Sequence, residues 1–364
     1  MNKSFIYLRG LKHVNYSVFC VTSDDSNKQK KSFQKTFYDP QFGITVPYSS
    51  GQQVKRSIIS DFLDVLGEKQ APITFVSVKD KSGKIGEGEV YSTCDPSYKD
   101  LLLGGWMQAK AGGTDRTLKR RSPLSISALT PLHPLLASVP YPAENISFER
   151  SDYPELHKII VRDTNGNELS DEEIANALNG SNRSLLRKYI QDNKRATGLF
   201  VYDIAIDLRR LFCVPTNQFE PEISNEMIAH LEKKGWQKSE NVFGECLVLP
   251  KEERDKVIPA LAHAMLNWRI TSNQARTFSL METLAVAISD NANTISGSIR
   301  AKLIENGERP KARPIVDESA GADVFVTLPC ASYIITESES ADALNAAEQK
   351  LIQMMSAFDY ENQL

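Results

Sequence analysis

The stretch GLFVYDIAIDLRRLF, residues 198–212, gives the clearest strand pattern in this chain, and the predicted fold is built around it. In a β-strand, alternate side chains point to the same face. Every second residue of this stretch is apolar, namely Phe200, Tyr202, Ile204, Ile206 and Leu208. Asp203 and Asp207 fall on the opposite face, where two carboxylates could hold a metal ion or simply meet solvent; we expect solvent. The stretch therefore predicts a strand with one buried face.

On both sides of this stretch, the sequence predicts further strands and helices in a regular order. Residues 14–22 (VNYSVFCVT) form a strand pattern that is rich in β-branched and aromatic residues. A helix follows the Ser-Ser-Gly turn at residues 49–51, and another covers residues 251–270. The apolar stripe of the first helix consists of Val54, Ile58, Phe62 and Val65. The order strand, helix, strands, then again strand, helix, strands predicts an α+β fold with a ferredoxin-like, RRM-like sheet.

Two segments interrupt this order and suggest insertions. Residues 80–122 are rich in Gly, Lys and Arg and have weak periodicity, whereas residues 151–197 carry helix signals. We divide the chain into a first palm part, a thumb-like basic insertion, a palm strand with its connection, a helical insertion, and a second palm part with a closing helix. In that order they are residues 1–79, 80–125, 126–150, 151–197 and 198–364.

Composition limits the kinds of function. The 364 residues carry a formal net charge of -3, so a nucleic-acid surface would have to be a local basic patch. The sequence contains no run of about 18 apolar residues and no signal-peptide core, so we expect neither a membrane span nor a membrane partner. The cysteines are scattered, which favours a reducing cytoplasm and buried thiols. They are Cys20, Cys94, Cys213, Cys246 and Cys330.

The first helix begins in a way that suits phosphate groups. A helix N-terminus presents free N–H groups and the positive end of a dipole. The residues at this end are Ser50, Gly51, Gln52, Lys55 and Arg56. The alternative is an ordinary serine cap followed by solvated cations.

Two other stretches are basic or rich in amides. TDRTLKRRSP contains Lys119, Arg120 and Arg121, a cluster that suits backbone phosphates, although a solvated loop is the alternative. Trp106 and Met107 lie upstream and could stack on bases if exposed, but we expect the tryptophan in the core. NWRITSNQARTF offers polar side chains to phosphates, sugars or base edges, or else only turn caps. They are Asn273, Gln274 and Arg276.

The sequence offers little that points to catalysis. The histidines (His13, His133, His157, His230 and His263) show no metal-ligand spacing, and no Walker loop, GxSxG or HExxH motif is present. We therefore expect no catalytic residues, no metal and no cofactor.

Several stretches together resemble one family. YDPQFGITVPYSSGQQVKRSI (residues 38–58) is similar to a motif of CRISPR RAMP-superfamily backbone subunits. LLGGWMQAKAGG with LKRRSPLSISALTPLHP resembles the thumb and the following strand of DevR-type members. Residues 198–212 and 271–289 are similar to later core strands of that family. The resemblance covers residues 14 to 290, with gaps.

The resemblance implies a function and a set of partners. Such proteins are crRNA-binding backbone subunits of Class 1, Cascade-like effector complexes, built from a palm, a thumb and helical insertions. Copies stack along one guide RNA, which pairs with target nucleic acid, and other subunits of the complex bind them. The resemblance places the residues named above in the helix at 50–56, the cluster at 119–121 and the loop at 273–276 next to the guide.

One departure from the family pattern bears on activity. Members that cleave target RNA carry an aspartate shortly before the Asp-Pro turn, whereas KKSFQKTFYDP has no acid in that window. We therefore expect a non-cleaving subunit. The alternatives are a metal-dependent endoribonuclease of the same superfamily that uses Asp24 or Asp25, and an unrelated metabolic enzyme with a deep pocket of converging titratable groups.

Overall fold

A computed structural model describes residues 4–24, 31–77, 79, 83, 85, 89–108, 117–139, 146–147, 158–178, 189–190, 195–272 and 278–364. The chain divides into two compact units. The larger unit consists of residues 1–139 and 196–364, and the smaller of residues 140–195. The inserted segment predicted at 151–197 falls largely in the smaller unit, and the remaining predicted boundaries stay predictions.

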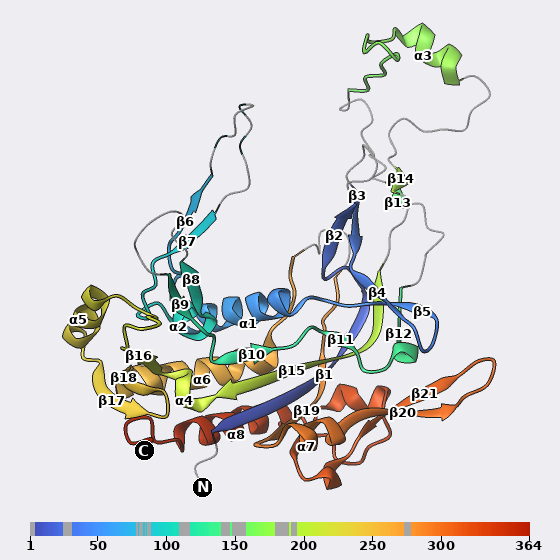
Figure 1. The fold of residues 1–364 in the computed structure, drawn as a ribbon. Helices are drawn as coiled ribbons and strands as arrows, with labels where there is room; N and C mark the ends of the chain where they lie inside the picture. The colour runs from blue at the N-terminus through green and yellow to red at the C-terminus, as the bar shows by residue number, and fades with distance from the viewer. Residues whose placement is uncertain are drawn as a thin grey trace. The chain divides into compact units, whose positions relative to one another are not determined.

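The larger unit is built on an antiparallel sheet whose two long strands are β1 and β15 (Figure 1). They pair from Phe5 opposite Asp207 to Val14 opposite Gly198. In spatial order the main strands are β10 (Leu124–Ile126), β15 (Ala196–Asp207), β1 (Phe5–Ser17), β19 (Thr283–Ser289) and β22 (Asp323–Val326). The short strands β11 (Thr130–Pro131) and β12 (Ala137–Ser138) also pair with β15.

Strand β15 confirms the pattern that predicted it. The five alternating apolar residues from Phe200 to Leu208 are all at most 2% exposed. Leu199 and Val201, on the other face, are buried as well. The sheet is therefore covered on both faces, whereas the sequence pattern predicted only one buried face.

Three helices contribute to the core on one face of the sheet: α1 (Gly51–Leu66), α6 (Lys251–Asn267) and α8 (Ala343–Ser356). In α1, the predicted residues Val54, Ile58 and Phe62 are fully buried. The prediction for Val65 is wrong, because this residue lies in the last helical turn, where its side chain is 49% exposed. In its last turns the apolar face of α1 continues through Leu63, which is buried, and Leu66, which packs against the core, instead of Val65.

A second, smaller core lies on the other face of β1. It joins Leu11 and Ala287 to Ile295 of α7 (Ala292–Ser298) and Ile299 at the start of a hairpin. The hairpin consists of β20 (Ile299–Glu305) and β21 (Lys311–Val316). Mixed helices and antiparallel sheets confirm the predicted α+β class. The ferredoxin-like detail stays an interpretation, which the order β10-β15-β1-β19 with α1 and α6 as connections favours.

The remaining elements are short. In the larger unit the paired strands are β2 (Val21–Asp24) with β3 (Lys31–Gln34), β4 (Thr36–Asp39) with β5 (Ile44–Pro47), β6 (Ile73–Val76) with β7 (Glu89–Ser92), β8 (Trp106–Gln108) with β9 (Leu118–Arg120), and β18 (Gly244–Val248) with both β16 (Cys213–Pro215) and β17 (Gln237–Asn241). The short helices there are α2 (Lys99–Gly104), α4 (Leu208–Leu211) and α5 (Asn225–Lys233). The smaller unit contains α3 (Asp171–Leu178) and the pair β13 (Ile146–Ser147) and β14 (Tyr189–Ile190).

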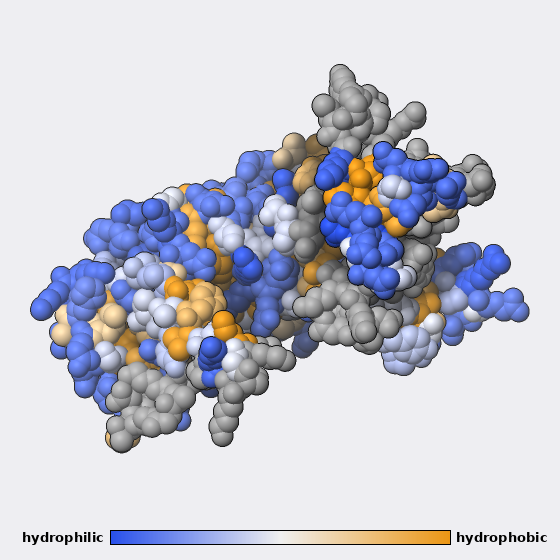
Figure 2. All heavy atoms as spheres, turned by 90° about the horizontal axis from the view of Figure 1, so that it is seen from above, coloured by the Kyte–Doolittle hydropathy of each residue, from blue (hydrophilic) through white to orange (hydrophobic). Residues whose placement is uncertain are grey.

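The distribution of polar, apolar and cysteine residues can be compared with what the composition predicted. On the face that Figure 2 shows, hydrophilic residues dominate and apolar residues gather in separate patches. All five cysteines are free and buried, as predicted. Within the described part of the chain, no helix combines the length and the apolar character needed to cross a membrane.

A glycine in the central strand makes room for an aromatic ring, which gives a testable prediction. A Cβ atom at Gly10 would lie 2.2 Å from Cε1 of Tyr202, whose ring is buried and whose hydroxyl donates to the Met265 carbonyl at 2.8 Å. Gly10→Ala is expected to lower the free energy of unfolding by about 1–3 kcal/mol through overpacking, as measured by urea denaturation. Gly104→Ala is the control, because nothing lies within 4 Å of its added Cβ. Equal stability of the two variants would contradict the prediction.

Candidate nucleic-acid interface

The start of α1 is capped and packed against the sheet. Ser50 is the N-cap, and its hydroxyl accepts a hydrogen bond from the backbone N–H of Gln53 at 3.3 Å. A Cβ at Gly51 would lie 2.9 Å from the carbonyl oxygen of Ile126, so only glycine fits there without a shift. Gln52 is exposed. The cap confirms the local prediction, while contact of these residues with RNA stays a prediction.

The two cations of this helix have different surroundings. Lys55 donates from Nζ to the carbonyl of Gly104 at 2.7 Å, at the C-terminal end of α2, where a cation meets the negative end of the helix dipole. Partial burial lowers the pKa of Lys55. Arg56 is exposed and makes no hydrogen bond or ion pair with any residue that the structure describes. Arg56 is therefore the better placed of the two for a phosphate.

Gly105 connects this helix to the basic cluster at residues 119–121. Its φ of 75° is in the left-handed region, and a Cβ there would lie 2.6 Å from the carbonyl oxygen of Arg120. The backbone at Gly105, the residue after the one that accepts from Lys55, therefore packs against the backbone of Arg120. The missing side chain of Gly105 allows this close approach.

The basic cluster is a strand, so its side chains alternate. β9 pairs with β8, with Lys119 opposite Met107 and Arg120 opposite Trp106. Lys119 and Arg121 are exposed, whereas Arg120 is 3% exposed. Trp106 is in the core, as expected, and Met107 is 60% exposed.

Arg120 is held entirely inside the protein. Its guanidinium donates to the carbonyls of Leu102 (3.2 Å), Cys213 (3.0 Å) and Arg210 (2.9 Å), and to Oε2 of Glu222 at 2.7 Å. Burial lowers its pKa, and the carboxylate of Glu222 opposes that shift. A guanidinium with four of its five donors engaged has little left for a phosphate. We therefore reassign Arg120 from RNA contact to a structural role.

Lys119 and Arg121 line one groove of about 820 Å³. Arg210, Phe219 and Phe243 line it too. The guanidinium carbon of Arg210 lies 3.8 Å from the ring centroid of Phe243, and Phe219 is 92% exposed. This combination of cations and an exposed ring suits a single-stranded nucleic acid, because phosphates meet the charges and bases stack on rings.

The groove also contains acids, which set its charge balance. Glu220 and Glu222 line it alongside the three cations. Glu222 is already neutralised, since Arg120 holds one carboxylate oxygen and Nη1 of Arg210 holds the other at 3.1 Å. Glu220 is exposed and opposes Lys119 and Arg121, so the three cations and two acids of the lining leave a net charge of +1.

The third predicted stretch lies outside the described residues: Asn273, Gln274 and Arg276. The residue before it, Ser272, accepts a hydrogen bond from Nε2 of Gln53 at 3.2 Å. The start of this loop thus lies against the first turn of α1. Its predicted RNA contacts stay predictions.

Sequence reasoning missed Arg210, Phe219, Phe243 and Gln53. The first three are far from residue 119 in the chain, and only the fold brings them to one groove. Arg210 carried a weak signal, since it belongs to an Arg-Arg pair near the end of the stretch 198–212.

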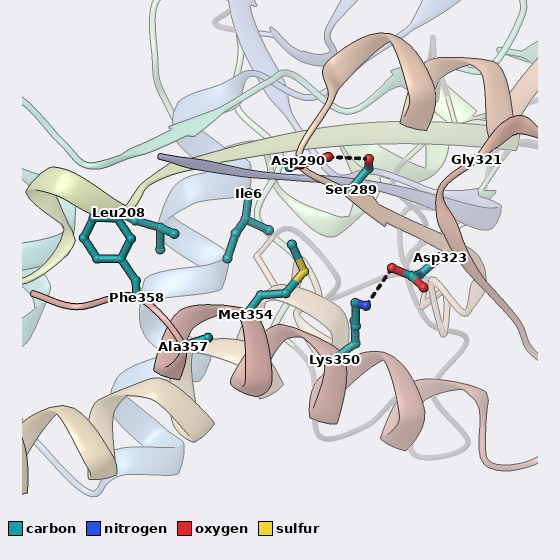
Figure 3. A pocket seen from close by; sticks show the side chains of 10 residues that line it. All are labelled: Ile6, Leu208, Ser289, Asp290, Gly321, Asp323, Lys350, Met354, Ala357 and Phe358. Atoms are coloured by element: carbon teal, nitrogen blue, oxygen red, sulfur yellow. Dashed lines mark hydrogen bonds and ion pairs between the residues drawn. The ribbon is translucent and has the colours of Figure 1, made fainter. Parts of the chain in front are cut away.

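One of the two aspartates on β15 has a cationic partner. Asp203 accepts hydrogen bonds from Arg9 at 2.7 and 2.9 Å, so its carboxylate faces a guanidinium. Among the described residues, no group of three or more His, Cys, Asp or Glu side chains could hold a metal ion. A pocket beside α8 has an apolar end at Ile6 and Phe358 and a polar end where Lys350 pairs with Asp323 at 2.9 Å (Figure 3). Its lining contains neither histidine nor cysteine.

Comparisons with known proteins give a distant likeness. No family model matches the chain, and no curated protein matches it. A solved structure called a CRISPR RNA-guided surveillance complex contains a chain that is 12% identical, with a TM-score of 0.38, over 96% of this chain and 84% of that one. A second, described as pre-nicking, gives 12% identity and a TM-score of 0.42 over 96% and 89%. Likeness at this level does not establish a family.

Proposed function

We propose that the protein is a guide-RNA-binding subunit of a Class 1 CRISPR effector complex. The groove of Lys119, Arg121, Arg210, Phe219 and Phe243 is the observation that carries the proposal. The family resemblance also supports the proposal. It places residues 38–58, which contain the start of α1, and residues 118–134, which contain Lys119 and Arg121, next to the guide RNA. The RNA backbone would bind the cations, and sequence would be read by base pairing with the target.

The finer role is a repeating backbone subunit without nuclease activity. Copies would line one guide RNA, and other subunits would bind at the ends of the array. The competing role, target-RNA cleavage, rests on Asp24 at the end of β2 or on Asp25, which lies outside the described residues. Incubating the assembled complex with complementary RNA and Mg²⁺ separates the roles, since cleavage lost in Asp24→Ala or Asp25→Ala would favour the nuclease.

RNA binding through the groove predicts a specific salt dependence. Replacing Lys119 and Arg121 together by Ala is expected to weaken single-stranded RNA binding and to flatten the plot of log K against log salt by about 1.4, since each phosphate contact contributes about 0.7. Filter binding across a salt series measures both quantities.

A matched control removes the same charge elsewhere. Lys302 and Arg313 are exposed partners on the hairpin of β20 and β21, so their double Ala variant tests net charge alone. Equal losses in the two double variants, or no RNA bound by the wild type, would overturn the proposal.

A further inference from the structure

A second pocket, of about 320 Å³, lies where β1, the residues after α6, the start of β19 and the start of α8 meet. We call it the Lys12 pocket. Lys12, Arg269, Glu282 and Thr283 line it together with apolar residues that include Met281 and Leu344. Neither the sequence patterns nor the RNA groove accounts for it.

Lys12 is an ammonium group inside the core. It is 1% exposed, and its Nζ donates to Oγ1 of Thr283 at 2.9 Å and to the carbonyl of Met281 at 3.2 Å. The ring centroids of Trp268 and Tyr202 lie 4.8 and 5.8 Å from Nζ. An ammonium has three donors, so one N–H remains for a ligand. Rings and neutral oxygens solvate the charge only partly.

No carboxylate of a described residue forms a salt bridge with Lys12, and Glu282, the acid in the pocket lining, pairs with Nδ1 of His13 at 2.7 Å. Asp61 on α1 attracts Lys12 but forms no salt bridge with it, and burial raises the pKa of Asp61, an effect that nearby His263 opposes. Burial, followed by repulsion from Arg269, lowers the pKa of Lys12 to about 7.

Arg269 brings a second cation to the same pocket. Its side chain is exposed, and it makes no hydrogen bond or ion pair within the described ranges. Two cations that repel each other thus share a pocket, and Glu282, the carboxylate in its lining, is already paired with His13. The pocket in Figure 3 differs, since its ammonium, Lys350, pairs with Asp323.

We propose that the Lys12 pocket binds a small oxyanion, a phosphate or carboxylate group, between Lys12 and Arg269. The free N–H of Lys12 and the guanidinium donate to its oxygens. Met281 and Leu344 offer contact to an apolar remainder of a larger ligand. This site is independent of the proposed RNA groove.

Binding has a consequence that a merely structural lysine would not show. An anion next to Nζ favours the charged form, so above pH 7 the complex takes up a proton at Lys12 and affinity falls as pH rises. The charged groups that act on Lys12 are Arg269, Asp61 and Glu282. Asp61 interacts in turn with His263, and Glu282 with His13.

Calorimetry on the full-length protein tests the proposal with inorganic phosphate and with acetate, at ionic strength matched with sodium chloride. Both are expected to bind the wild type, and the tighter of the two identifies the class of ligand. Acetate at pH 8, titrated in two buffers of different ionisation enthalpy, is expected to show uptake of about one proton. Arg269→Gln is expected to weaken binding about tenfold, the effect of one charged hydrogen bond.

Lys12→Met is expected to abolish the proton uptake, and Lys350→Met, which removes a paired ammonium, is expected to leave it unchanged. Absence of binding beyond that of chloride, binding without proton uptake, or equal affinity in Arg269→Gln would overturn the proposal. The wild-type and Arg269→Gln measurements decide the question even if Lys12→Met does not fold.

Discussion

Arg120→Met is expected to lower the free energy of unfolding by about 3–5 kcal/mol, the largest loss among the changes considered. The substitution removes a buried cation and leaves Glu222, which is 7% exposed, without its 2.7 Å partner. It also leaves the carbonyls of Leu102, Cys213 and Arg210 without their donor. Arg210 still holds Oε1 of Glu222, but Oε2 is left buried without a partner, and this lost compensation of the carboxylate dominates the loss.

Urea denaturation followed by circular dichroism measures this effect. Lys119→Met is the control, because Lys119 is adjacent to Arg120 in the chain but its side chain is exposed. This substitution is expected to change the free energy of unfolding by less than about 0.5 kcal/mol. Adding Glu222→Gln to Arg120→Met is expected to restore part of the stability by removing the buried charge that has lost Arg120, although Arg210 then loses its carboxylate partner. A single variant as stable as the control would show that Arg120 is not structural.

Lys12→Met is expected to have the second largest effect, and in the opposite direction. The pKa of Lys12 is lowered from 10.5 to about 7 by burial, so the unfolded chain binds this proton more tightly than the native protein. The resulting penalty is complete below pH 7 and declines as pH rises from 7 towards 10.5. Because methionine removes the charge but loses the hydrogen bonds to Met281 and Thr283 and the ring contacts, we expect a gain of about 2–3 kcal/mol at pH 7.

The pH dependence identifies the cause. Wild-type stability, measured against the variant, is expected to rise by about 2 kcal/mol between pH 7 and pH 9 as the burial penalty disappears. Lys350→Met is the matched control, since Lys350 is partly exposed and already paired with Asp323. A difference between wild type and Lys12→Met that stays constant with pH would show that Lys12 is not the titrating group.

The burial of Arg120 and of Lys12 gives the basic residues of this protein different roles. Lys119, Arg120 and Arg121 look equivalent in the sequence, yet one supports the fold and two face the groove. Loss of RNA binding in an Arg120 variant would therefore report on folding, and only Lys119 and Arg121 test the interface. Lys12 lies in a strand that carried no functional signal, and it lines a separate pocket.

Several helices and strands of this protein could be predicted from short-range sequence patterns. Alternation predicted β15, the three- and four-residue period predicted most of the buried stripe of α1, and Ser50 predicted the helix cap. The α+β class followed from the order of these elements. These features depend on residues close together in the chain, so a local pattern is enough to predict them.

The burial of individual charges and the grouping of residues into one site depend on long-range packing, which the local patterns did not predict. Strand alternation separates Arg120 from Lys119 and Arg121, but the inner face became known only once Glu222 and Cys213, about a hundred residues away, were in place. Long-range contacts likewise bring Arg210 and Phe243 to the groove, and Trp268 and Thr283 to Lys12. A side chain's partner depends on how distant segments pack, and that packing is absent from any local pattern.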